Sequence, residues 1–287
     1  ILSPTKLTTK HFSFLKRIAY PYFFLNADSV LYTANADSIL AHDLKKNKLK
    51  YGFINPSRNG CVFIEVDKTL YVFDFTGISH LENGKLVKDA NFSTQAPNFQ
   101  VFEVKFLTKT QLLLATSDGL LRYDISKNKI HQVYRTPNNV PIRTILPYKG
   151  AYLLGTYGEG IYVYKNGLVK AIAIDPMNNL KFAHAFMPLN DGSMWISTNN
   201  GLFRIIGNEL LRGFDQPNFQ PNYQYFGKNE GLPVTEFNGG CIPAAITLKD
   251  GRLSFPTIDG LIQFSPTLVP RACLLYTSDA ADEEDSV

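Results

Sequence analysis

The stretch Asp191–Ile205, "DGSMWISTNNGLFRI", decides the fold of this chain. An Asp-Gly turn precedes one strand-like run, and an Asn-Gly pair separates that run from a second one. Asn and Gly tolerate the positive φ that two-residue hairpin connections require. The stretch therefore predicts an antiparallel hairpin that is reached through an earlier turn.

The same order of strand, threonine, turn, glycine and strand recurs along the chain. Clear copies are "LLLATSDGLLRYD" at Leu112–Asp124, "YLLGTYGEGIYVY" at Tyr152–Tyr164 and "LSFPTIDGLIQFSP" at Leu253–Pro266, with weaker copies at Leu70–Leu81 and Val30–Asp43. Successive copies lie 39, 42, 41, 41 and 59 residues apart, measured at Ser38, Gly77, Gly119, Gly160, Gly201 and Gly260. Residues that repeat in register are structural, so we expect this role for Thr116, Thr156, Thr198 and Thr257.

Each copy contains enough strands for one blade of a β-propeller. A further apolar strand precedes each threonine strand, and a short turn follows the glycine strand at Asn47, Asn83, Asn128, Asn166 and Asn208. Four antiparallel strands in about 40 residues are typical of propeller blades. A β-sandwich has similar strand spacing but no such register, and helical repeats need a 3.6-residue period. The sequence predicts an all-β propeller with six visible four-stranded blades, and a seven-bladed ring stays open.

We expect the propeller to occupy residues 1–270 as a fragment, followed by a non-native or disordered acidic tail at residues 271–287. Without that tail, 28 basic and 20 acidic residues remain, and the lysines are scattered among turns. This pattern favours a solvated surface and no nucleic-acid partner. No apolar run approaches the length of about 18 residues that a spanning helix needs, so we expect no membrane insertion within this chain.

The repeat and the last blade resemble a known family. "DGSMWISTNNGLFRI", together with "NEGLPVTEFNGG" and "DGRLSFPTIDGLIQFSP", is similar to the two-component regulator propellers, the sensor modules of bacterial hybrid histidine kinases. The resemblance covers Asp37–Pro266. Ser197 replaces the family's glycine before threonine in the tryptophan copy, and Pro256 replaces it in the last copy.

The resemblance implies a periplasmic sensor that has no enzymatic activity of its own. Such propellers lead through a tyrosine-rich domain and a membrane helix to a kinase, so kinase activity would lie outside this chain. The implied partners are a small-molecule ligand, often a glycan fragment, and a second copy of the full-length protein in a homodimer. Two alternatives stay open: a propeller enzyme, either a lyase or a glycoside hydrolase, and a protein-interaction scaffold.

Candidate ligand contacts follow from the propeller geometry, because blades converge at the axis where their inner strands begin. By register, Arg143 and His184 occupy equivalent strand starts, Glu103 lies near the same level, and further polar residues lie in nearby loops. The alternative is an ordinary polar lining of a wet channel. The candidate contacts are Glu103, Asn139, Arg143, Asn179, Lys181, His184, Glu236 and Asn238.

Signals for catalysis or cofactors are weak. The five histidines have no metal-ligand spacing, and no nucleophile elbow or phosphate-binding glycine loop occurs. We therefore expect no catalytic residue, no metal and no cofactor. Trp195 occupies a repeat position that other copies fill with Leu, which places it in the core. Cys61 and Cys241 could pair or remain small buried hydrophobes.

Overall fold

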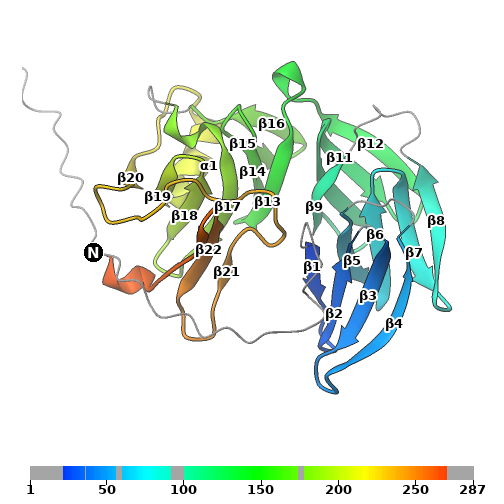
Figure 1. The fold of residues 1–287 in the computed structure, drawn as a ribbon. Helices are drawn as coiled ribbons and strands as arrows, with labels where there is room; N and C mark the ends of the chain where they lie inside the picture. The colour runs from blue at the N-terminus through cyan, green and yellow to red at the C-terminus, as the bar shows by residue number, and fades with distance from the viewer. Residues whose placement is uncertain (1–21, 36, 56–59, 92–99, 174–177, 270–287) are drawn as a thin grey trace, which may run out of the picture.

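Six antiparallel sheets in sequence order form the molecule. The computed structural model describes residues 22–35, 37–55, 60–91, 100–173 and 178–269. Within them the first five sheets have four strands and the sixth has three. Figure 1 shows the sheets following one another around a central axis. The predicted all-β propeller is confirmed, whereas a seventh blade stays a prediction and residues 270–287 lie outside the described residues.

Within each blade the strands are arranged in sequence order, with the first strand nearest the axis and the last strand at the outer edge. Blades one to three contain β1 (Tyr22–Leu25), β2 (Val30–Ala34), β3 (Ser38–Asp43), β4 (Lys48–Ile54), β5 (Val62–Val66), β6 (Thr69–Asp74), β7 (Gly77–Glu82), β8 (Lys85–Asn91), β9 (Val101–Phe106), β10 (Gln111–Thr116), β11 (Gly119–Asp124) and β12 (Lys129–Tyr134). Blades four to six contain β13 (Ile142–Tyr148), β14 (Ala151–Thr156), β15 (Ile161–Lys165), β16 (Leu168–Ala171), β17 (Ala183–Pro188), β18 (Ser193–Thr198), β19 (Gly201–Ile206), β20 (Tyr223–Phe226), β21 (Ile246–Thr247), β22 (Leu253–Thr257) and β23 (Gly260–Phe264). The helical segments are η2 (Pro137–Asn139), η3 (Asn179–Lys181), α1 (Gly207–Asp215) and η4 (Pro266–Leu268).

The repeated threonine closes the hairpin between the second and third strands of its blade. The Thr116 hydroxyl donates to the Gly119 carbonyl at 2.9 Å and accepts from the Asp118 amide at 3.1 Å. The corresponding threonines of blades four, five and six make the same pair of bonds. These bonds join the side chain to the backbone of the tight turn on both sides. The expected structural role of the threonines is confirmed.

The asparagine turns between third and fourth strands form in four blades and fail in the fifth. Asn47, Asn83, Asn128 and Asn166 adopt positive φ of 49°, 48°, 50° and 52°. The turn predicted at Asn208 is wrong, because this residue lies in α1, which connects β19 to β20. Leu210 and Phe214 are buried one helical turn apart and pack into the core between blades four and five. This helix accounts for part of the long 59-residue step.

Five hydrophobic cores hold the propeller together; four lie between two neighbouring blades, and the core of blades two and three also contains Tyr22 of blade one. The core between blades five and six contains Trp195, which is 1% exposed. Its ring lies 4.8 Å from the rings of both Phe226 and Phe264, so aromatic packing joins β18 to β23. The prediction that this tryptophan belongs to the core is confirmed.

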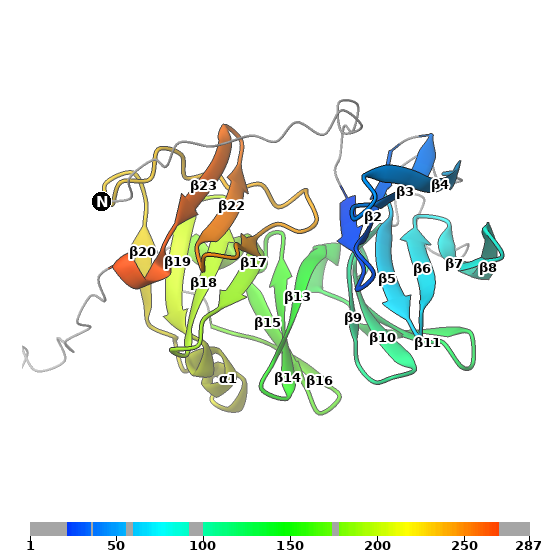
Figure 2. The ribbon, with the colours of Figure 1, turned by 90° about the horizontal axis from the view of Figure 1, so that it is seen from below.

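The sixth blade meets the first through the segment that leads into β21. Ile242 forms a parallel bridge with Tyr22 of β1, and the Phe23 amide donates to the Ile242 carbonyl at 3.0 Å. Tyr22 also belongs to the hydrophobic core of blades two and three, and Ile242 packs against that core as a partly buried residue. Figure 2 shows β22 and β23 in one half of the molecule and β2 and β3 in the other.

Candidate ligand-binding site

A cavity of about 620 Å³ lies where the inner strands converge, and all six blades line it. Its walls come from β1, β5, β9, β13 and β17 and from residues 239–245, which lead into β21. Most of the lining is apolar, with a few polar side chains. This size and composition suit a small-molecule site.

Three consecutive blades place an extra residue at the start of the inner strand. In blades three, four and five the pairing of first and second strands shifts next to the repeat threonine. The extra residues of these β-bulges are Phe102, Arg143 and His184. A bulge redirects a side chain relative to the regular pleat. The repeat therefore presents three different side chains at equivalent positions of one cavity.

Arg143 is held between aromatic rings without a charged partner. Its guanidinium carbon lies 4.1 Å from the ring centre of Phe102 and 5.0 Å from that of Tyr157. Its Nε is buried without a hydrogen-bond partner, and no described carboxylate forms an ion pair with it. Burial lowers the pKa of Arg143, although a guanidinium stays protonated in proteins. The cavity therefore contains an unneutralised positive charge.

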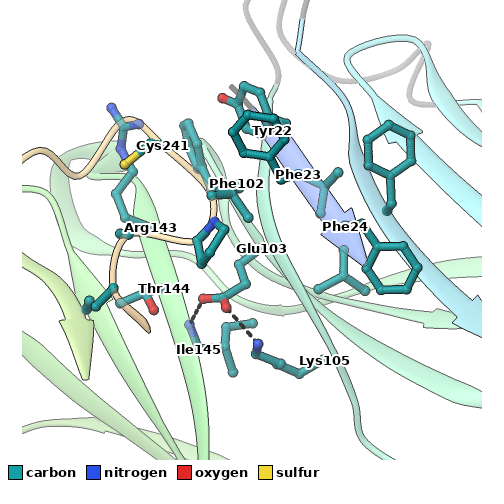
Figure 3. A pocket seen from close by; sticks show the side chains of 18 of the residues that line it. Tyr22, Phe23, Phe24, Phe102, Glu103, Lys105, Arg143, Thr144, Ile145 and Cys241 are labelled. Atoms are coloured by element: carbon teal, nitrogen blue, oxygen red, sulfur yellow. Dashed lines mark hydrogen bonds and ion pairs between the residues drawn. The ribbon is translucent and has the colours of Figure 1, made fainter. Parts of the chain in front are cut away.

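Glu103 lies in the same cavity but is already engaged. Its carboxylate accepts a hydrogen bond from the Ile145 amide at 2.7 Å and pairs with Lys105 Nζ at 2.8 Å. Figure 3 shows these two contacts as dashed lines and Arg143 on the neighbouring strand without one. Among the described lining residues, Glu103 is the only acid. Its negative charge is therefore directed to Lys105 and not to Arg143.

His184 is a buried, neutral ring that supports the cavity wall. It is 3% exposed, and its Nε2 lies 2.5 Å from Asn199 Oδ1, which assigns the proton to Nε2. Burial lowers the pKa of His184, and the nearby charge of Arg143 acts in the same direction. Its Nδ1 has no partner, and a Cβ built on Gly239 would lie only 2.2 Å from it. The loop backbone can approach the ring this closely because residue 239 is glycine.

The first and sixth blades complete the rim with Tyr22 and Cys241 (Figure 3). The Tyr22 hydroxyl accepts from Gln100 Nε2 at 3.0 Å, and burial raises its pKa. Burial also raises the pKa of Cys241, which keeps it a thiol. Cys61 and Cys241 do not form a disulfide with each other; Cys61 is buried, and its Sγ donates to Asn55 Oδ1 at 3.5 Å.

The structure brings together three of the eight predicted contacts and leaves five outside the cavity lining. Glu103, Arg143 and His184 line the cavity. The other five lie in loops and short helices, and they are Asn139, Asn179, Lys181, Glu236 and Asn238.

Three of these five residues make hydrogen bonds that hold the nearby loops in place. Asn179 Oδ1 accepts from Asn200 Nδ2 at 3.0 Å, and Asn238 Oδ1 accepts from the Gly240 amide at 2.8 Å. The Lys181 carbonyl accepts from the amides of Gly158 and Gly160. Asn139 and Glu236 have exposed side chains.

Sequence reasoning missed the aromatic residues around the guanidinium. Phe102 is the bulge residue of blade three and so the true register equivalent of Arg143, one position before Glu103. Tyr157 directly follows the repeat threonine of blade four. A register count that allowed one bulged residue opposite each threonine would have found Phe102, whereas the contact between Tyr157 and the guanidinium of Arg143 needed the structure.

No described group of histidine, cysteine and acidic side chains could hold a metal ion. In the described ranges, no helix has the length and apolar character required to cross a bilayer. No protein-family model matches the chain, and no curated protein matches it.

Solved propellers share the fold. The extracellular domain of BT3049 from B. thetaiotaomicron, assigned as a hybrid two-component system, is similar with a TM-score of 0.62 and 16% identity. The match covers 88% of this chain and 39% of that chain, so the present chain spans well under half of that domain. The WD40 propeller of Doa1 matches with a TM-score of 0.59 and 14% identity, over 84% of this chain and 77% of that one. At these identities the comparisons show the β-propeller fold.

Proposed function

We propose that this propeller is the extracytoplasmic ligand-sensing part of a hybrid two-component system and acts on a downstream histidine kinase. The observation that carries the proposal is the axial cavity, in which the unpaired Arg143 faces space shared by all six blades. Similarity to an extracellular domain assigned to such a system supports it. The sequence motifs in the last blade point to the same family.

A binding role agrees better with the cavity than catalysis does. Sugar hydrolysis normally needs two carboxyl groups about 5 to 10 Å apart. Glu103 is the only acid among the described lining residues, and Ile145 and Lys105 already occupy its oxygens. His184 is too buried, and too closely covered by Gly239, to exchange a proton with a ligand. We therefore propose that the chain has no enzymatic activity of its own.

The remaining parts of the proposal concern the whole protein. The propeller would lie in the periplasm, bind a small molecule such as a glycan fragment, and signal as a homodimer of the full-length protein. Ligand binding would change the arrangement of the two copies and thereby the activity of the kinase.

Recovery of the complete gene tests this proposal first. We expect the reading frame beyond the last blade to encode a small tyrosine-rich domain, a membrane helix and a histidine kinase. A reading frame that ends shortly after the propeller, or continues into an unrelated enzyme, would contradict the proposal. A kinase-dependent transcriptional reporter, exposed to pools of glycan fragments, then measures whether the intact receptor responds.

A further inference from the structure

We propose that the axial cavity binds a small molecule through a carboxylate that pairs with the guanidinium of Arg143. This inference rests on the proposed sensory role and names the chemical class of its ligand. Three features of the site support this inference. Arg143 carries a charge that is not neutralised, no nearby described group can neutralise it, and two aromatic rings orient its guanidinium.

The first feature is the cost of the unpaired charge. Arg143 lies on an inner strand with its Nε buried and without a hydrogen-bond partner. A desolvated charge without a counter-ion destabilises a fold, so buried charges are normally paired. A buried polar atom without a partner is explained by strain, by a functional role, or by a water molecule or ion bound there. The positive charge therefore points to an anion that is bound only in the complex.

The second feature is that no nearby described group can neutralise Arg143. The carboxylate of Glu103 is held by Lys105 and by the Ile145 amide. The Tyr22 hydroxyl is bonded to Gln100 and, with its raised pKa, remains neutral. The anion must come from outside the described residues.

The third feature is the orientation of the guanidinium. Phe102 and Tyr157 contact it at 4.1 and 5.0 Å from their ring centres, which restricts its motion. Arginine presents a planar fork of donors that matches the two oxygens of a carboxylate. One fixed cation matches one negative charge, which favours a carboxylate over a more highly charged phosphate.

The rest of the cavity provides surface for the body of the ligand. Phe23 and Phe102 contribute aromatic side chains, and residues 242–245 contribute apolar ones, to a space of about 620 Å³ (Figure 3). Such walls pack against a sugar ring or an aromatic ring equally well. Two kinds of acid therefore share the required chemistry: a sugar acid and an aromatic acid.

Calorimetric titration of the 287-residue chain tests the inference with matched pairs of probes. Glucuronate is compared with glucose, benzoate with benzamide, and inorganic sulfate serves as a different anion. The test variant is Arg143→Met, which keeps an unbranched side chain but removes the charge and the fork. The control variant is Arg135→Met, because Arg135 is exposed, pairs with Asp118 and lies outside the cavity.

We expect one of the acids to bind and its neutral counterpart not to bind. Arg143→Met should raise the dissociation constant by about 10- to 100-fold, the effect of losing a hydrogen bond to a charged group. Arg135→Met should leave the dissociation constant unchanged. The acid that binds identifies the source class. Thermal unfolding without ligand should show no lower midpoint for Arg143→Met than for Arg135→Met, because a partly buried charge without a partner is removed.

Three results would overturn the inference: neither acid binds, the acid binds Arg143→Met as tightly as the original chain, or sulfate binds as tightly as the acid. A much lower unfolding midpoint for Arg143→Met would also overturn it, because it would make the arginine a structural element. These results concern the ligand alone. Failure of the sensory role would appear instead in the gene downstream of the propeller and in the reporter response.

Discussion

The repeated threonine hydroxyl should stabilise each of the four blades that contain it by an amount that one substitution can measure. Thr116→Val keeps the shape of the side chain and removes the hydroxyl. The residue is fully buried, with 0% of its surface exposed. The change breaks the bonds to the Gly119 carbonyl and the Asp118 amide. Each lost bond costs about 1 kcal/mol, and a partner left buried and unpaired costs more, so we expect a loss of about 2 to 3 kcal/mol.

Equilibrium unfolding in urea gives this value, provided that the slope of the transition is the same for both proteins. Thr116→Ser is the matched control, since it keeps the hydroxyl and loses one methyl group, at a cost of about 1 kcal/mol. If Thr116→Ser destabilises the protein more than Thr116→Val, packing and not hydrogen bonding explains the repeat. A loss below about 0.5 kcal/mol for the valine variant would refute the reasoning in the same way.

Three further predictions concern the cavity wall and the core. The lowered pKa of His184 means that the unfolded chain binds the proton more tightly, so the free energy of unfolding should fall as pH decreases below about 6.5. In urea unfolding, His184→Gln should make this pH dependence less steep. The pH dependence that is left should come from His42, whose pKa is also lowered. Gly239→Ala should cost about 1 to 3 kcal/mol because its Cβ would meet His184, whereas Gly240→Ala, whose nearest neighbour is 3.2 Å away, should cost less in the same assay. Trp195→Ala should cost about 3 to 5 kcal/mol in unfolding free energy, yet calorimetry should find ligand affinity unchanged because this residue lies outside the cavity lining.

The fold could be predicted from the sequence because the blade repeats its own local chemistry. A threonine, a turn and a glycine at fixed spacing determine the hairpin in four blades, and six copies of the strand, turn and strand order in register determine a propeller. The helix at Gly207–Asp215 escaped prediction because Asn208 occupies the position of a turn asparagine in the other blades. Its apolar residues, Leu210 and Phe214, fit the core between two blades, which favours a helix over a two-residue turn.

The site could be predicted only where register alone determines position. Arg143 and His184 were found because each begins an inner strand, but the bulge that makes Phe102 their equivalent moves the count by one residue. Glu236 and Asn238 were expected at the axis from their closeness in sequence to the glycines at 239 and 240. Only the glycines and the residues after them line the cavity. Glu236 and Asn238 lie in a loop, where no regular alternation fixes the direction of a side chain from that of its neighbour.

The most direct test of the central claim is the dose response of the full-length receptor to its ligand in a transcriptional reporter. The account predicts that the acid bound by the propeller changes kinase output, and that Arg143→Met shifts the response to about 10- to 100-fold higher concentration at equal receptor abundance. Arg135→Met should respond like the original protein. An unchanged response for Arg143→Met would contradict the claim that the axial cavity is the sensory site.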